Sequence, residues 1–178
     1  MLFGQHRSRP DDAVFARWRD VTPNFSLRMS NLVAAAARPQ LALLGERARI
    51  WNDRYGRLAV ALAKLPGLRL PHRPQEEEFV QSSIQFAVSG LDDAGFAGFL
   101  EACRGRGVYL KWFGAKQAMG YTSVSAQWGF LRDPHTPAVT AEVPERLCDM
   151  RIPLTLTEAE CGTIATIISE ELSIARGC

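Results

Sequence analysis

Long apolar runs and lysine are both scarce in this 178-residue sequence. No apolar run approaches the roughly 20 residues that a transmembrane helix needs. Residues 1–12 contain no apolar stretch of the kind found in a signal peptide. These absences argue against a membrane protein and a secreted protein. We therefore expect a cytoplasmic protein that has no membrane partner.

Positive charge is not concentrated in any part of the chain. The only lysines are Lys64, Lys111 and Lys116, the arginines are spread along the sequence, and the formal net charge is +2. A nucleic-acid-binding protein more often has a basic stripe with aromatic side chains between the basic ones. We therefore expect no nucleic-acid partner.

Metal-binding and redox spacings are also missing. The four cysteines form no C-x-x-C pair, which argues against a zinc site or a redox motif. The three histidines lie in loop-like contexts, and no two of them have the spacing of metal ligands. We expect no metal site, exposed histidines (His6, His72 and His135) and buried free thiols (Cys103, Cys148, Cys161 and Cys178).

No self-sufficient catalytic motif is present. The sequence has no G-x-S-x-G, no P-loop and no H-E-x-x-H. The acidic run at 76–78 stands beside two prolines and is typical of a solvated loop. We therefore assign no catalytic residue within this chain.

The sequence does contain a strong helical pattern near its N-terminal third. Residues 1–27 are poorly patterned, apart from a short helix expected at 11–20, and 31–38 should form another short helix. Proline 39 should start or kink the next helix, because proline lacks the amide proton. An apolar stripe in steps of three and four then predicts a helix over 41–65, about 37 Å long. The stripe consists of Leu41, Leu44, Ala48, Trp51, Tyr55, Leu58, Leu62 and Leu65.

The remaining residues predict a compact α+β unit. Apolar residues alternate over 80–88, which indicates a strand with one buried face. Asp92 should cap a helix, 108–113 should be a strand, and 148–156 a short extended segment that Pro153 places at a sheet edge. Thr157 and Glu160 form a capping box before a last helix. The expected fold is a small, mainly antiparallel sheet packed by helices, with 1–40 as the end of a larger preceding domain, 41–65 as a connecting helix and 66–178 as a small domain.

One segment resembles a known family. Arg28-Met29, Ala34-Ala35 and Gln40-Leu41 match, at the right spacing, a segment of the DegT/DnrJ/StrS aminotransferases, which are fold-type-I pyridoxal-phosphate enzymes best known from amino-sugar biosynthesis. Later pieces match in order over residues 20–175: Tyr55 with Leu58, Pro66-Gly67, the strand at 84–88, the turn at 106–108, the segment at 151–154 and the helix at Thr157.

The resemblance implies part of a homodimeric aminotransferase. The family's Schiff-base lysine lies upstream of the Arg-Met segment, so this chain alone should be inactive, and pyridoxal phosphate should bind covalently only in the complete parent. The parent would move an amino group from an amino acid to a keto-sugar or similar carbonyl. Ser26, where the family has asparagine, and Arg28 would face the cofactor phosphate or the substrate across a dimer interface. Arg28 could instead pair with a carboxylate at a helix start.

The residues proposed to face the substrate are Lys111, Trp112 and Tyr121. Their aromatic members, together with Phe113 and Trp128, could equally pack the sheet against a helix.

Two other functional classes stay open. The chain could be a non-catalytic small-domain module for binding or protein interaction, or an independent enzyme with a novel site. A stand-alone module should bury the stripe from Leu41 to Leu65 within itself. A piece of a larger protein should leave part of that stripe, and the segment 33–37, uncovered.

Overall fold

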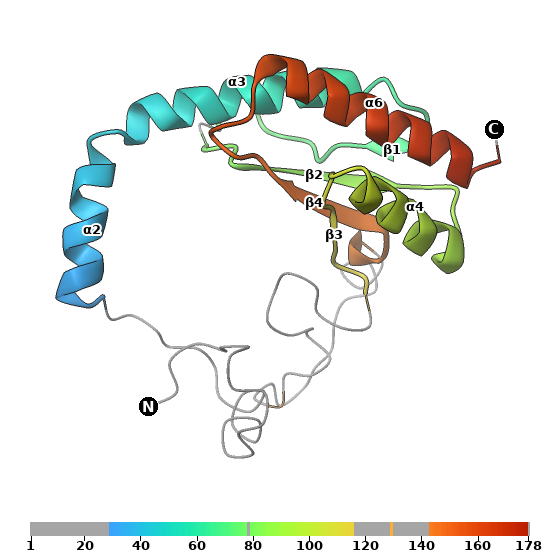
Figure 1. Ribbon diagram of the computed structural model, residues 1–178, viewed down its shortest axis with the longest axis horizontal. Helices are drawn as coiled ribbons and strands as arrows, with labels where there is room; N and C mark the ends of the chain where they lie inside the picture. Colours follow the sequence, from blue (N-terminus) through green and yellow to red (C-terminus); the bar gives the residue numbers. More distant parts are fainter. Residues whose placement is uncertain (1–28, 78, 116–128, 130–142, 178) are drawn as a thin grey trace.

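The computed structural model describes residues 29–77, 79–115, 129 and 143–177, and Figure 1 draws the chain from N- to C-terminus. Its elements follow the order helices, strands, helix, strands, helix. They are α2 (Asn31–Leu41), α3 (Leu44–Leu62), β1 (Leu68–Arg69), β2 (Ser83–Val88), α4 (Asp93–Gly105), β3 (Lys111–Trp112), the 3-10 helix η2 (Val143–Arg146), β4 (Leu147–Arg151) and α6 (Glu158–Ala175). The expected α+β class is confirmed for the described residues.

The four strands form one antiparallel sheet in the order β1-β2-β4-β3. The longest ladder joins β2 to β4, where Ile84 lies opposite Met150 and Phe86 opposite Cys148. These four side chains point to one face, because neighbouring residues on a strand point to opposite faces. All four are buried, so this face of the sheet meets the helices.

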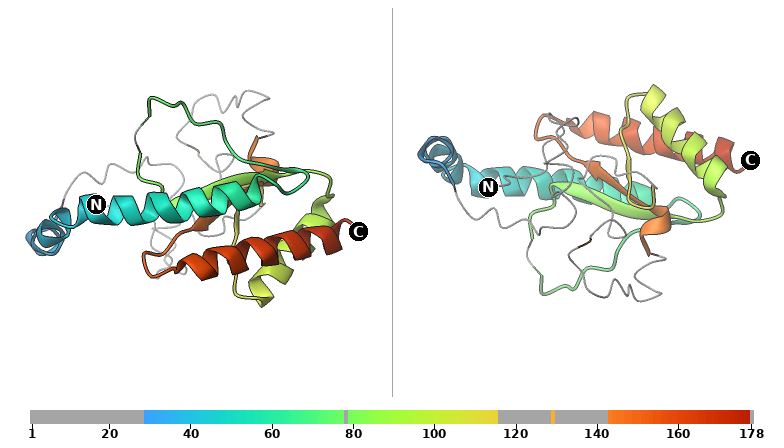
Figure 2. Two further views of the ribbon diagram at one scale, coloured as in Figure 1. Left: turned by 90° about the horizontal axis from the view of Figure 1, so that it is seen from above. Right: turned by 90° about the horizontal axis from the view of Figure 1, so that it is seen from below.

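Helices α3 and α6 lie side by side over that face, and α4 packs beside α6 (Figures 1 and 2). The core that they enclose is continuous. It includes Leu58 and Leu62 of α3, Phe96 and Phe99 of α4, and Ile168 and Leu172 of α6, all with at most 2% of their surface exposed. The apolar positions predicted for α4 and α6 therefore face the core, with Leu100 and Ile164 partly buried at its margin.

Local signals in the sequence fix the ends of these helices. The Asp92 carboxylate accepts a hydrogen bond from the Gly95 amide at 2.8 Å, and Thr157 and Glu160 make the reciprocal bonds of a capping box. Both caps were predicted, and both are confirmed. They satisfy amide donors that have no partner inside the helix.

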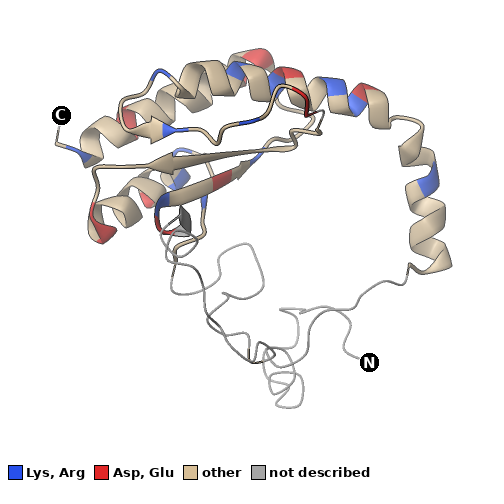
Figure 3. Ribbon diagram, turned by 180° about the vertical axis from the view of Figure 1, so that it is seen from behind, with Lys and Arg blue, Asp and Glu red and all other residues tan. Residues whose placement is uncertain are grey.

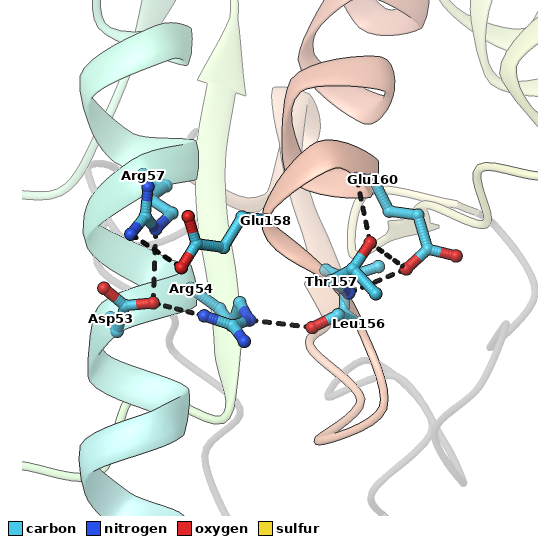
Figure 4. A network of polar contacts seen from close by, with 7 residues as sticks. All are labelled: Asp53, Arg54, Arg57, Leu156, Thr157, Glu158 and Glu160. Atoms are coloured by element: carbon cyan, nitrogen blue, oxygen red, sulfur yellow. Dashed lines mark hydrogen bonds and ion pairs between the residues drawn. The ribbon is translucent and has the colours of Figure 1, made fainter.

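A network of polar contacts, with one ion pair between the helices, joins α3 to the start of α6 (Figure 4). Arg57 pairs with Asp53 at 3.2 Å and with Glu158 at 3.0 Å. Arg54 also pairs with Asp53 and donates a 2.7 Å hydrogen bond to the Leu156 carbonyl. The hydrogen bond from Arg57 is the main cause that lowers the pKa of Asp53. These contacts hold the two helices together at the solvent side.

The cysteines inside the described part are buried free thiols, as predicted. They are Cys103, Cys148 and Cys161, while Cys178 lies outside the described residues. Burial raises the pKa of Cys103 to about 12 and also raises the pKa values of the other two thiols. Such thiols are poor nucleophiles, because the thiolate is the reactive form.

The long helix is shorter than predicted. A break at residues 42–43 separates α2 from α3, so Pro39 does not start the long helix but lies in the last turn of α2. The 19 residues of α3 span about 28 Å rather than about 37 Å. Figure 1 shows the chain turning sharply at the break.

Three strand predictions also need correction. The segment containing Pro153 is not at a sheet edge: β4 lies between β2 and β3, and it ends at Arg151 before the proline. Proline has no amide hydrogen to donate to a strand ladder. It is tolerated here because the pairing of β4 ends before it. Val80 precedes β2 and is exposed, and the strand predicted over 108–113 is limited to Lys111–Trp112.

Candidate functional site

The face of the sheet opposite the helices carries a group of polar side chains. In the strand register, Lys111 of β3 and Gln85 of β2 both lie opposite Asp149 of the central strand β4. Arg151 stands two residues further along β4, opposite Ser83. We call these five residues the polar face.

An ion pair lies at the centre of the polar face. The Lys111 ammonium is 3.6 Å from an Asp149 carboxylate oxygen. The Asp149 side chain is only 7% exposed and that of Lys111 is 18% exposed. Asp149 is the one buried charged residue among those that the structure describes. Because an unpaired buried carboxylate is strongly destabilising, Asp149 needs the lysine, and the lysine is held in a fixed place.

Trp112 points the other way, although it follows Lys111 directly. It lies opposite Cys148, its ring centroid is 5.0 Å from that of Phe96 in α4, and its indole N–H donates a 2.7 Å hydrogen bond to the Glu145 carbonyl. Gly114 permits this arrangement, since a Cβ there would lie 2.6 Å from both the Glu145 Cα and the indole nitrogen. Trp112 therefore packs the sheet against α4, which is the packing alternative for this aromatic residue.

Two of the predicted site residues, Lys111 and Trp112, lie in the described part of the chain, and they are on opposite faces of the sheet. The three others, Ser26, Arg28 and Tyr121, lie outside the described residues, so their predicted roles stay predictions.

Of the five residues of the polar face, sequence reasoning singled out only Lys111 and missed the other four, including its partner Asp149. A signal was available. An aspartate stands between Cys148 and Met150 in a short strand-like segment, and an acid in an otherwise apolar strand needs a partner on the neighbouring strand.

The lysines stand in different surroundings. Lys64 is exposed just beyond the end of α3, and Lys111 is paired with Asp149. Lys116 lies outside the described residues. Among the described residues, no three His, Cys, Asp or Glu side chains gather in a way that could hold a metal ion.

No described helix is both long enough and apolar enough to cross a bilayer. His72 and the acidic residues Glu76 and Glu77 are exposed, as predicted for their segments.

Comparisons with known proteins place the fold. No protein-family model matches the sequence, and no curated protein matches it. Several solved structures do match. The aminotransferase TlmJ from Streptoalloteichus hindustanus is similar to this chain with a TM-score of 0.64 and 16% sequence identity. The match covers 80% of this chain and 36% of TlmJ.

Two further structures agree with this likeness. The 3-amino-5-hydroxybenzoic acid synthase matches with a TM-score of 0.64 and 16% identity, over 93% of this chain and 49% of its own. DesI, solved in the presence of its TDP-sugar product, matches with a TM-score of 0.63 and 18% identity, over 94% of this chain and 44% of its own. The chain therefore has the fold of part of a sugar-aminotransferase-type chain and spans less than half the length of these structures.

Proposed function

We propose that this chain supplies the connecting helix and the small domain of a pyridoxal-phosphate-dependent aminotransferase of the sugar-modifying type. In this proposal it is inactive alone, because another polypeptide segment carries the lysine that binds the cofactor. The complete enzyme would be a homodimer and would transfer an amino group to a keto-sugar or a similar carbonyl.

The observation that carries the proposal is the apolar surface of residues 29–50, which we call the arm. Helix α2 has no buried residue, and Leu32 is 81% exposed and Leu41 68% exposed. An isolated helix of this length is marginal in water, since most helices are stabilised by packing of their apolar face. The arm therefore has the character of a segment that packs against something else.

The share of the matched structures that this chain covers supports the same reading. The match takes in most of this chain but only 36% to 49% of the aminotransferases named above. In these structures the part that this chain does not match is at least as long as the part that it does, and that remainder is a natural cover for the arm. DesI was solved with a TDP-sugar product, which favours a sugar-type substrate for this chain's parent.

The proposed residue roles follow the faces of the sheet. Lys111 is the described residue that we retain as substrate-facing, because its amine lies on the face away from the helical core. Trp112 would act by positioning the strand through its contact with Phe96. Ser26 and Arg28 toward the cofactor phosphate, and Tyr121 toward the substrate, stay part of the proposal. When bound, pyridoxal phosphate supplies the electron sink for transamination.

A non-catalytic binding module is the second candidate, and one observation favours it. The core from Tyr55 to Leu172 is continuous, and every fully buried side-chain nitrogen and oxygen in the described part has a hydrogen-bond partner. A unit of this kind is able to fold without a larger partner. The two candidates differ in whether the arm needs a cover.

The proposal is tested by two experiments. First, the purified chain is mixed with pyridoxal phosphate, reduced with borohydride and weighed by mass spectrometry. We expect no stoichiometric adduct at a single lysine, and the variants Lys64→Arg, Lys111→Arg and Lys116→Arg serve as controls. Turnover of a keto-acceptor by the chain with only coenzyme and an amino donor would overturn the proposal.

Second, the DNA upstream of the Met1 codon is read for an in-frame Ser-x-x-Lys segment, and the encoded polypeptide is produced joined to this chain. The joined protein is expected to form the visible-absorbing cofactor–lysine adduct and to transaminate. Replacement of two arm residues, Leu32→Gln with Leu41→Gln, should weaken both. Absence of a cofactor-binding segment upstream and in neighbouring genes would favour the binding module.

A further inference from the structure

We propose that the polar face is an oxyanion-binding site, in which Lys111 and Arg151 bind a phosphate or carboxylate group and Asp149 holds Lys111 in position. The proposal concerns the chain as it stands. It holds whether or not the chain completes an aminotransferase, because it depends only on side chains that the described strands bring together.

Geometry places the two cations close to each other. Lys111 lies directly opposite Asp149, and Arg151 is two residues further along the same strand as Asp149. Diagonal neighbours of this kind on adjacent antiparallel strands are about 7 Å apart and point to the same face. Their side chains are long enough to converge on one bound group.

In this proposal Asp149 positions Lys111 and does not itself contact the bound anion. Its carboxylate is nearly buried, whereas Lys111 is more exposed than Asp149 and Arg151 is exposed. A lysine ammonium has three donors, and the 3.6 Å contact with Asp149 engages it from one side only. The remaining donors are available to a ligand, while the buried carboxylate fixes the position of the amine.

Donors outnumber acceptors on the polar face. Within the described part of the chain, no hydrogen bond or ion pair is formed by the Arg151 guanidinium, and none by the side chains of Ser83 and Gln85. Arg151 contributes five N–H donors in a planar fork that suits carboxylate and phosphate oxygens. An oxyanion accepts several hydrogen bonds at once, so it matches this arrangement better than a cation or an apolar group.

The charges on the described strands agree with this proposal. Four charged residues of the strands point to this side of the sheet: Arg69, Lys111, Asp149 and Arg151. Figure 3, which colours the ribbon by charge, shows basic segments on the strands around an acidic one. Three positive groups against one negative group leave a net positive field, which attracts anions.

Arg69 provides a matched control. It lies opposite Ala87 at the other end of β2, whereas Arg151 lies opposite Ser83. Both are exposed arginines on the same face, and removing either one changes the net charge by the same amount. Only the Arg151 change alters the proposed site.

The test is a titration of the full 178-residue chain with sodium phosphate, followed by the amide NMR signals at constant ionic strength. A parallel titration uses sodium acetate, which distinguishes a carboxylate from a phosphate, and sodium chloride is the blank. We expect saturable shifts of the Lys111, Asp149 and Arg151 amides. Arg151→Gln should weaken binding at least tenfold, and Arg69→Gln should change it less than twofold.

A second variant removes the other cation without leaving a buried carboxylate unpaired. Lys111→Met combined with Asp149→Asn should also weaken binding at least tenfold, and its thermal unfolding curve should show that the fold survives. Shifts that do not saturate, shifts that lie away from the polar face, or equal weakening by Arg69→Gln and Arg151→Gln would each overturn the proposal, since they indicate only general screening of charge.

Discussion

We call residues 51–115 and 143–177, without residue 78, the body. The arm and the body share the same helical pattern of apolar residues, but these residues are mostly exposed in the arm and mostly buried in the body. Leu58 and Leu62 in the second half of α3 are fully buried, whereas Leu44 in the first turn of the same helix is 47% exposed and Leu41 before it is more exposed still. Helical periodicity therefore predicts that an apolar face exists, but not what covers it.

The change from arm to body falls within one helix, and specific contacts mark it. The indole N–H of Trp51 donates a 2.9 Å hydrogen bond to the Ile152 carbonyl, and the Asn52 side chain accepts one from the Gln81 amide at 3.0 Å. From this point α3 is tied to the segments next to β2 and β4. The body therefore includes the second half of α3 as one packing unit, while the division of the chain into a connecting helix and a small domain at residue 65 stays a prediction.

The most direct test of this difference is to replace one leucine by alanine in the body and one in the arm. Leu58→Ala should lower the free energy of unfolding by about 3 kcal/mol, because it removes buried methyl groups and leaves a cavity. Leu44→Ala, in the same helix, should change it by less than about 0.5 kcal/mol. Urea denaturation followed by circular dichroism measures both. Equal losses would mean that the arm is packed in solution.

A smaller loss is expected at the turn after α3. Gly67 has a φ of +70°, and a Cβ there would lie 2.2 Å from the Arg176 guanidinium, which donates a 2.6 Å hydrogen bond to the Ser89 carbonyl and another to the Pro66 carbonyl. Gly67→Ala should cost about 2 kcal/mol, from backbone strain and displacement of this contact.

A double variant separates the two causes. In an Arg176→Ala background the displaced guanidinium is absent, so the cost of Gly67→Ala should fall to about 1 kcal/mol, the part due to the left-handed backbone. An unchanged cost in that background would show that the Arg176 side chain adapts freely to the added methyl group and that its displacement does not contribute to the cost.

The capping box of α6 tests a local contribution to the body. Thr157→Ala should lower the free energy of unfolding at neutral pH by about 1 kcal/mol. Hydrogen bonds from the Thr157 side chain, and then from its backbone, lower the pKa of Glu160. A lowered carboxyl pKa stabilises the fold above the ordinary value near 4.5 and loses that effect as the pH falls through the folded value.

The difference between the wild-type chain and Thr157→Ala should therefore shrink, in part, as the pH falls below about 4.5. Thermal unfolding at a series of pH values measures it. Thr163→Ala, which removes a hydroxyl that bonds only within the same helix, is the matched control and should show no such pH dependence. A difference that grows on acidification would contradict the assignment.

Local structure could be predicted from the sequence, whereas its placement could not. The caps at Asp92 and Thr157 and the alternating strand β2 are set by neighbouring residues, so they could be predicted. The central place of β4 depends on pairing with strands more than thirty residues away, and Pro153 alone pointed the wrong way. The same limit applies to the candidate site, because the partner of Lys111 is Asp149 on another strand.

The smallest effect on stability is expected in the arm, where the effect on association is expected to be largest. Leu32→Gln combined with Leu41→Gln removes apolar surface from the arm. Because both side chains are already in contact with water, the free energy of unfolding should change by less than about 0.5 kcal/mol. Exposed apolar patches promote association, so the variant should bind less hydrophobic dye and should self-associate less in sedimentation velocity.

The matched control replaces an exposed apolar residue outside the arm, Ile174→Gln on α6, which is 67% exposed. It should leave dye binding and sedimentation close to those of the wild-type chain. If instead the arm variant unfolds at markedly lower urea concentration, α2 is packed against this same chain in solution. The arm would then be part of the body, and it would no longer need a second polypeptide segment to cover it.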